Sequence, residues 1–374
     1  TRELGGDFGR RAALIASEKV APAMDRQIAE LERQRTRATQ DAGVWKLPDG
    51  EAYYGWALRA ATTSNMTPDE VHQLGLEQIR ALSAQMDPLL RAQGLTQGTV
   101  GERMTALGKN PKHLFPNTDA GRKQILDYID GRIADVRTRL PRAFHTLVEG
   151  RLVVKRVPPA IEEGAPGGYA AAGTIDGSVP GQYYINLRDT AMWPRYALPT
   201  LTYHEGIPGH IWQGEYTYDM PLIRSLLAFN AYSEGWALYA EQLGDELGVY
   251  EGDPLGRLGY LQSMSFRACR LVVDTGLHAK RWTRDHAIQW FATTNGSTVE
   301  EVQGEVDRYC AWPGQACGYK MGHNEINRLR GKAEAALGDG YDYKAFNDAV
   351  VKTGGVPMTV LEQEVDAHIA ERRA

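Results

Sequence analysis

The 374-residue sequence lacks any apolar run long enough to cross a bilayer as a helix, so it predicts no membrane span. It has no block of lysine and arginine interleaved with aromatic residues, and its formal net charge is −5, so no nucleic-acid partner is predicted. The three cysteines, Cys269, Cys310 and Cys317, form no Cys-x-x-Cys pair, which argues against a redox role and against a thiolate zinc site. Internal repeats and low-complexity segments are also absent.

The amino-acid composition is typical of a folded protein. Hydrophobic residues make up 43% of the chain and charged residues 24%. A chain of this length can bury a substantial core, as one large or two closely packed helical domains.

Helix start signals recur along the chain. Residues 67–70 read Thr-Pro-Asp-Glu, which supplies an N-cap hydroxyl, a proline for the first turn and a glutamate for a capping box. They predict a helix that runs to about Met86. Similar signals begin at Thr298 and Thr359. Residues 10–40 are charged and predict a long helix packed on the surface.

The middle of the chain predicts a small sheet. Residues 151–157 and 182–187 have the pattern of strands and are separated by a segment rich in glycine and proline. Within that segment, residues 168–173 are expected to form a flexible loop. If the second strand, which carries Tyr184, lies at the edge of the sheet, it can pair with the backbone of an extended peptide. A plain hairpin that covers the core is the alternative.

Residues 203–210 read Tyr-His-Glu-Gly-Ile-Pro-Gly-His, a stretched form of the His-Glu-x-x-His zinc signature. His204 and His210 are six residues apart, and six residues of a regular α-helix rotate a side chain by about 240°. A regular helix therefore cannot aim both imidazoles at one ion. Pro208 has no N–H, and a glycine stands on each side of the Ile-Pro pair, so the sequence predicts a break between the two histidines.

The same pattern also fits a glycine- and proline-rich helix end in which His210 is an ordinary hydrogen-bonded side chain. The next predicted helix, residues 231–243, favours a metal site, because Glu234 and Glu241 lie two turns apart on one face. Glu234 stands among aromatic and apolar residues, where an unpaired charge is costly, although a solvated charge is the alternative. Two imidazoles and one carboxylate are a ligand set for zinc that leaves a position for water.

A helix predicted over residues 256–282 carries a polar stripe made of Arg267, Arg270 or Cys269, Asp274 and His278. Because the other faces are apolar, the stripe is expected to face a cavity. Asp274 is a candidate to accept the second ring N–H of a zinc histidine.

Two arginines are candidates to grip a peptide carboxylate by bidentate hydrogen bonds, Arg270 and Arg308. A structural ion pair with Asp274 or Glu305 is the alternative for either one.

Four motifs together resemble the DUF885 family. They are His-Glu-Gly-Ile-Pro-Gly-His at 204–210, Ser-Glu-Gly-Trp at 233–236, Arg-Leu-Val-Val-Asp-Thr-Gly-Leu-His at 270–278, and Pro-Gly-Gln-Ala with Tyr-Lys-Met-Gly between 313 and 322. Their order and spacing match as well, and the resemblance spans nearly the whole chain. The family is in turn similar to the gluzincin metallopeptidases, in which a glutamate is the third zinc ligand.

The resemblance implies a mainly α, multi-helix gluzincin-like (M3/M32-like) catalytic domain with a small β-sheet next to the zinc helix. Residues 1–150 are expected to form a helical region that packs over the cleft, and residues 151–374 the zinc-binding catalytic region, within one continuous large domain. Family members are usually longer, with a further helical segment before the point that corresponds to Thr1, so a processed or truncated form is expected. They often carry export signals, which favours an exported bacterial protein, periplasmic or secreted, over a cytoplasmic one.

The expected function is a zinc-dependent peptidase that hydrolyses short peptides. One Zn²⁺ ion, held by the two histidines and Glu234, would activate a water whose proton passes to Glu205, and Glu205 would then protonate the leaving amine. Similarity to the gluzincins implies that Tyr319 or His278 donates a hydrogen bond to the developing oxyanion.

Two other classes of function are left open by the sequence. One is a metal-dependent hydrolase of a non-peptide amide or ester, and the other is a non-catalytic zinc-containing binding or scaffold protein. The expected partner is a peptide or small amide substrate. The sequence predicts no oligomeric state.

Overall fold

The computed structural model describes residues 7–373, except for the side chain of Ser225. The chain divides into two compact units, Thr1–Ala42 and Gly43–Ala374. Residues on both sides of position 150 therefore belong to the same unit.

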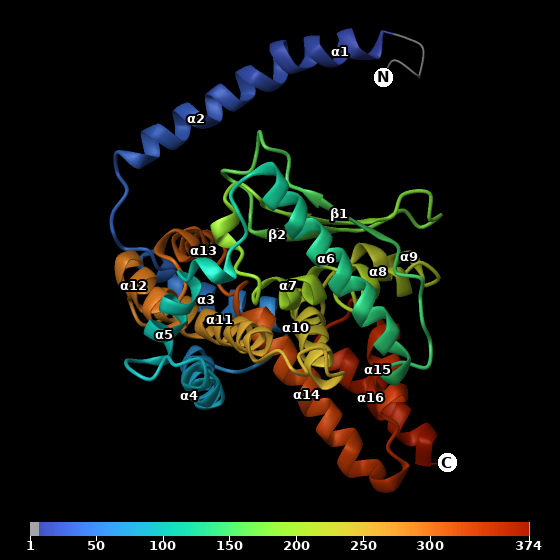
Figure 1. The fold of residues 1–374 in the computed structure, drawn as a ribbon. Coiled ribbons are helices and arrows are strands. Elements are labelled where there is room, and N and C mark those ends of the chain that lie inside the picture. The colour runs from blue at the N-terminus through green and yellow to red at the C-terminus, as the bar shows by residue number, and fades with distance from the viewer. Residues whose placement is uncertain (1–6, 374) are drawn as a thin grey trace. The chain divides into compact units, whose positions relative to one another are not determined.

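The described part of the first unit is helical. It consists of α1 (Phe8–Ile15), a π-helical turn η1 (Ala16–Val20) and α2 (Ala21–Arg35) (Figure 1). None of the residues in these three elements is buried. The predicted charged helix is therefore present, and it ends at Arg35 rather than near residue 40.

The second unit combines many helices with three short strands (Figure 1). Its α-helices are α3 (Gly50–Thr62), α4 (Pro68–Ala92), α5 (Val100–Gly108), α6 (Asp119–Arg139), α7 (Leu198–Glu205), α8 (His210–Tyr216), α9 (Leu222–Leu226), α10 (Asn230–Glu246), α11 (Pro254–His278), α12 (Arg284–Asn295), α13 (Val299–Ala311), α14 (Cys317–Leu337), α15 (Tyr343–Thr353) and α16 (Met358–Arg373). Short 3₁₀ turns are η2 (Val44–Lys46), η3 (Pro111–His113), η4 (Leu140–Arg142), η5 (Thr190–Met192) and η6 (Gly338–Gly340). The predicted mainly α architecture with a small sheet is confirmed.

The predicted helix starts are found close to where the sequence placed them. The Thr67 hydroxyl accepts from the Glu70 N–H, and the Glu70 carboxylate accepts from the Thr67 N–H at 2.7 Å, so the capping box of α4 is complete. Thr298 caps α13 in the same way through its hydroxyl. The third helix, α16, begins at Met358, one residue before Thr359.

The sheet contains β1 (Leu152–Arg156), β2 (Gly168–Ala171) and β3 (Gly181–Ile185) in the order β1-β3-β2. β1 runs parallel to β3, and β2 runs antiparallel to it. Both predicted strands are confirmed, but the segment expected to be a flexible loop forms β2. The prediction that the strand carrying Tyr184 lies at an edge is wrong, because the backbone of residues 168–171 occupies its second side.

A close helix crossing positions one side of the site. α10 packs against both α7 and α14, and α11 packs along α4. A Cβ at Gly322 of α14 would lie 1.7 Å from the backbone oxygen of Ala231 of α10, so only glycine permits this approach. The crossing brings the start of α14 beside the first turns of α10, which carry Glu234.

Two further features concern the chain as a whole. Over residues 7–373, no helix has both the length and the apolar character that a bilayer span requires. The three cysteines are free thiols, and Cys269 and Cys317 are buried.

Candidate metal centre

The backbone leaves the helical path between the two histidines. α7 ends at Glu205, Gly206 has φ −97° and ψ −101°, and α8 begins at His210. The predicted break is therefore confirmed. Gly209 makes it possible, because a Cβ at this position would lie 1.8 Å from the backbone oxygen of His204.

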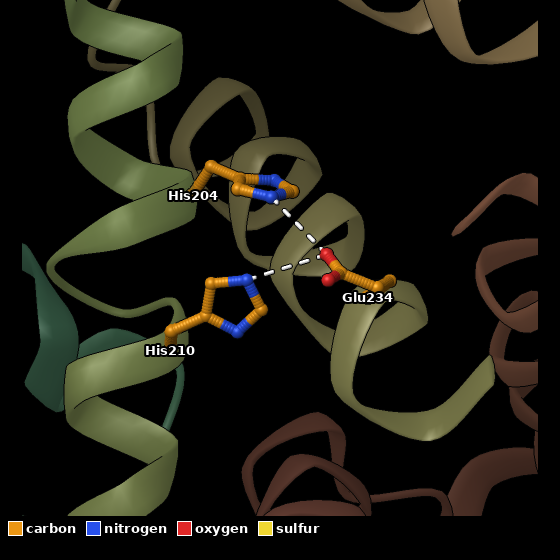
Figure 2. A group of neighbouring side chains, drawn as sticks. All are labelled: His204, His210 and Glu234. Carbon is orange, nitrogen blue, oxygen red and sulfur yellow. Dashed lines mark ion pairs between the residues drawn. The ribbon is translucent and has the colours of Figure 1, made fainter. Parts of the chain in front are cut away.

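This break directs three side chains toward one point. His204 projects from the end of α7 and His210 from the start of α8, and both face Glu234 on α10 (Figure 2). Glu234 Oε2 lies 3.5 Å from His204 Nε2 and 3.3 Å from His210 Nε2. One ligand atom from each residue lies within 4.8 Å of the others. These three residues are termed the metal cluster below.

The spacing of the metal cluster fits a tetrahedral ion. Ligand atoms bound to zinc at about 2.0–2.1 Å with tetrahedral angles lie about 3.4 Å apart. The two measured distances, 3.5 and 3.3 Å, bracket that value, whereas a charge-assisted N–H···O hydrogen bond is about 2.7–2.9 Å long. Oε2 of Glu234 is buried without a hydrogen-bond partner, and a divalent cation would satisfy it. The residues present therefore fit zinc.

Glu241 fixes the orientation of His204. It follows Glu234 by two turns of α10 and is fully buried. One of its carboxylate oxygens lies 2.9 Å from His204 Nδ1, and the other accepts hydrogen bonds from the hydroxyls of Thr200 and Ser263. Because Glu241 holds the proton on Nδ1, the Nε2 atom of His204 is left as the ligand atom that faces Glu234.

Nearby charges determine the protonation of the metal-free cluster. Burial acts to lower the pKa of His204, but hydrogen bonds with Glu234 and Glu241 outweigh burial and raise this pKa to about 9. Burial acts to raise the pKa of Glu234, yet His210 and His204 hold it well below its usual range. At neutral pH the metal-free cluster thus contains a protonated His204 and an ionised Glu234, and zinc must displace the His204 proton.

Two of the predicted catalytic residues lie beside the metal cluster. Glu205 directly follows His204 and is 7% exposed. Burial and then the charge of Glu205 raise the pKa of Tyr183 on β3, which places that carboxylate close to the Tyr183 phenol. Tyr319, at the start of α14, has its ring parallel to the His204 ring, with the planes 6° apart and the centroids 6.3 Å apart.

Two other predicted residues belong to a separate, closed group. One ring nitrogen of His278 accepts from a backbone N–H at 3.1 Å, and the other lies 3.0 Å from a backbone oxygen. Asp274 accepts from the Tyr54 hydroxyl at 2.7 Å and from the Gly314 N–H at 3.0 Å. We term Tyr54, Asp274, His278 and Gly314 the Asp274 cluster.

The Asp274 cluster corrects two expectations. With both ring nitrogens engaged by the backbone, His278 has no donor to offer an oxyanion. The partners of Asp274 are Tyr54 and Gly314 rather than a zinc histidine, and Glu241 takes the role that the sequence analysis gave to Asp274. Three members of the polar stripe of α11, Arg270, Asp274 and His278, are buried and hydrogen-bonded within the protein.

The remaining predicted site residues contact other parts of the protein. Arg270 and Arg308 donate to the same carboxylate, Glu305, at 2.7 and 3.0 Å. The structural ion pair, which was the alternative to a substrate role, is therefore present for both. Tyr184 lies on the central strand and stacks on Tyr169 with ring centroids 4.9 Å apart. A substrate contact by Tyr184 stays a prediction.

The chain has relatives among solved structures, whereas no curated protein matches it. The crystal structure of a "putative lipoprotein" from Colwellia psychrerythraea is 44% identical, with a TM-score of 0.92 over 95% of this chain and 61% of that one. A "putative lipoprotein of unknown function" from Shewanella oneidensis is 20% identical, with a TM-score of 0.76 over 93% of this chain and 64% of that one. The second likeness concerns the fold alone. The chain spans less than two thirds of the length of either protein.

The family assignment follows from a match over most of the sequence. The model of a family described as "Bacterial protein of unknown function (DUF885)" matches residues 5–365. The chain therefore belongs to the DUF885 family of bacterial proteins of unknown function.

Proposed function

We propose that this protein is a zinc-dependent hydrolase of the gluzincin type that cleaves amide bonds in short peptides. The observation that carries the proposal is the metal cluster, in which both imidazoles lie at the separation of tetrahedral zinc ligands from one carboxylate oxygen. A zinc ion bound there would supply a water of lowered pKa and an electrophile for a carbonyl oxygen.

Glu205 is suited to handle the protons of the reaction. It adjoins His204 and is largely shielded from solvent, so its carboxylate can accept a proton from the attacking water and return it to the leaving amine. Tyr319, at the start of α14, is a phenol that stays protonated at neutral pH, because burial and then the charge of Glu234 raise its pKa to about 12. It can donate a hydrogen bond to the oxygen that becomes negative.

The sheet supports a peptide as the substrate. β2 has β3 on one side and is the edge strand that packs against α7 and α8, which carry the two histidines. An extended peptide can add to such an edge through backbone hydrogen bonds. Residues 168–171 of β2, rather than the strand that carries Tyr184, are therefore the edge strand that we propose pairs with a peptide.

We also propose that the protein is exported, either periplasmic or secreted. Both structural relatives are described as putative lipoproteins, which supports this location. Fractionation of a bacterium that expresses the natural gene tests it, and recovery of the protein only from the cytoplasm would contradict it.

The Glu205→Gln variant tests the catalytic proposal. Zinc should remain bound at the level of the parent protein, because the three ligands are intact, while hydrolysis of a short-peptide library should fall by about 10²- to 10⁴-fold. Glu325→Gln is the matched control, since this carboxylate forms an ion pair with Arg328 three residues along α14 and is not part of the metal cluster. It should leave both quantities unchanged.

Three results would redirect the proposal. Hydrolysis retained by Glu205→Gln refutes the general-base assignment. Hydrolysis of acylated small molecules by a zinc-loaded parent that ignores peptides favours a non-peptide amide or ester substrate. Bound zinc with no hydrolysis of either class favours a binding or scaffold role.

A further inference from the structure

Hydrogen bonds hold the side chain of Arg270 in a fixed orientation. It is 7% exposed. Its Nε donates to the Tyr309 hydroxyl at 3.0 Å and its Nη2 to Glu305 at 2.7 Å. Glu305 also accepts from Tyr309 at 2.6 Å and from Arg308 at 3.0 Å. Because one carboxylate and one phenol grip two edges of the guanidinium, the plane of that group cannot turn freely.

The fixed guanidinium lies on the ring of Tyr319. The Cζ atom of Arg270 is 4.2 Å from the centroid of that ring, within the range of a cation–π contact. The third nitrogen, Nη1, is buried and has no hydrogen-bond partner. Tyr319 is also the residue whose ring runs parallel to His204. The arginine is therefore one side chain removed from the proposed zinc ligands.

The charges that act on the Tyr319 phenol come from three helices. Glu234 on α10 raises its pKa, Arg270 on α11 and Arg308 on α13 lower it, and Glu305 on α13 raises it, all in addition to the dominant effect of burial. The two guanidinium groups thus oppose two carboxylates and the low-dielectric surroundings.

We propose that Arg270 is a positioning residue for Tyr319: its clamped guanidinium holds the phenol ring beside His204, where the hydroxyl can donate a hydrogen bond to the substrate oxygen. This inference rests on the proposed hydrolase function. The positioning role accounts for a buried arginine whose Nη1 atom forms no hydrogen bond, because the guanidinium that contains Nη1 lies against the Tyr319 ring. The Arg270–Glu305–Arg308 group then supports Tyr319, and none of its members needs to contact substrate.

The first test needs no substrate. 3-Fluorotyrosine is placed at position 319, and ¹⁹F NMR follows the chemical shift and line width of its ring. Arg270→Gln should shift and broaden the resonance, because the guanidinium no longer holds the ring in one orientation. Arg284→Gln, which breaks an arginine–aspartate pair with α13, is the matched control and should leave the spectrum unchanged. Equal spectra in all three proteins would overturn the inference.

The second test measures coupling in the hydrolysis reaction. Arg270→Gln should lower kcat about tenfold with little change in KM, and it should cause no further loss in a Tyr319→Phe background. Arg270→Lys, which keeps the charge without the fork, should lose less and serves if the glutamine variant does not fold. A full additional loss in the Tyr319→Phe background, or a rise in KM confined to peptides with a free terminal carboxylate, would overturn the inference. Failure of the hydrolase proposal shows separately, as an inactive parent protein whose ¹⁹F spectrum still responds to Arg270→Gln.

Discussion

The metal cluster and the Asp274 cluster are both groups of buried or partly buried polar groups, but their hydrogen bonds differ. In the Asp274 cluster, the two carboxylate oxygens and both ring nitrogens have partners within the chain. In the metal cluster, Glu234 Oε2 has none, and its nearest imidazole nitrogens stand at 3.3 and 3.5 Å. A closed group stabilises the fold, whereas an open one is prepared for something that is added later.

Loss of a ligand should affect the metal cluster most strongly. The His210→Ala variant should reduce bound zinc from about one ion per chain to below about 0.1, because two protein ligands rarely hold zinc against a chelator. Metal analysis after dialysis measures this. His145→Ala, at an exposed histidine that pairs with Asp342, is the control and should keep its zinc. Full zinc retention by His210→Ala would remove the contrast between the two clusters.

Removing a hydrogen-bond acceptor from the Asp274 cluster should lower the stability of the fold and leave zinc binding unchanged. Asp274→Ala leaves the Tyr54 hydroxyl and the Gly314 N–H without their acceptor, so the free energy of unfolding should fall by about 3 kcal/mol. Zinc content should not change in the folded protein. Denaturant unfolding provides the first quantity and metal analysis the second. Asp69→Ala, which breaks an exposed pair with Lys280, should cost less than about 1 kcal/mol. If Asp274→Ala instead lost zinc at full stability, the roles of the clusters would be exchanged.

A change at Glu241, whose carboxylate orients the ligand His204, should have an intermediate effect. Glu241→Gln keeps the size of the side chain but removes the charge that orients His204, and zinc affinity should fall by about 10- to 100-fold. Competition with a chromophoric chelator measures this affinity. Glu246→Gln, farther along α10 in an ion pair with Arg330, should leave it unchanged. Equal zinc affinities for both variants would mean that Glu241 stabilises the core but does not affect how His204 binds zinc.

The last prediction concerns how stability depends on pH when a chelator keeps the protein free of metal. The pKa of His204 is raised from 6.5 to about 9 in the folded, metal-free state. Its stabilisation is therefore complete below pH 6.5 and is lost as the pH rises through about 9, with a slope of at most about 1.4 kcal/mol per pH unit. Zinc affinity should instead rise with pH over the same range, because zinc must displace this proton. Unfolding in chelator across this range should show the slope, and His204→Gln should abolish it. A slope shared by both proteins would assign the titration to another group.

The features that the sequence predicts well are those encoded by neighbouring residues. The glycines around Pro208 predict the break, and the capping box at Thr67 predicts the start of α4. The i, i+7 spacing of Glu234 and Glu241 is also local, and it is the signal that pointed to the right helix face, although the role of Glu241 was given to Asp274.

The features that could not be predicted from the sequence depend on contacts between distant segments. The partners of Asp274 are 220 and 40 residues away, so its pattern on α11 alone could not show that it is satisfied. Likewise, β3 becomes central only because residues 168–171 pair with it, and their glycine- and alanine-rich sequence has little strand propensity of its own. A buried stripe and a stripe facing a cavity have the same periodicity.

The most direct test of the account is to locate the metal itself. Crystals of the protein purified with zinc present are measured above and below the zinc absorption edge, and an anomalous difference map is calculated. We expect one peak about 2.0–2.2 Å from His204 Nε2, His210 Nε2 and a carboxylate oxygen of Glu234. An empty map at that point, with the three side chains hydrogen-bonded to one another at ordinary distances, would contradict the account.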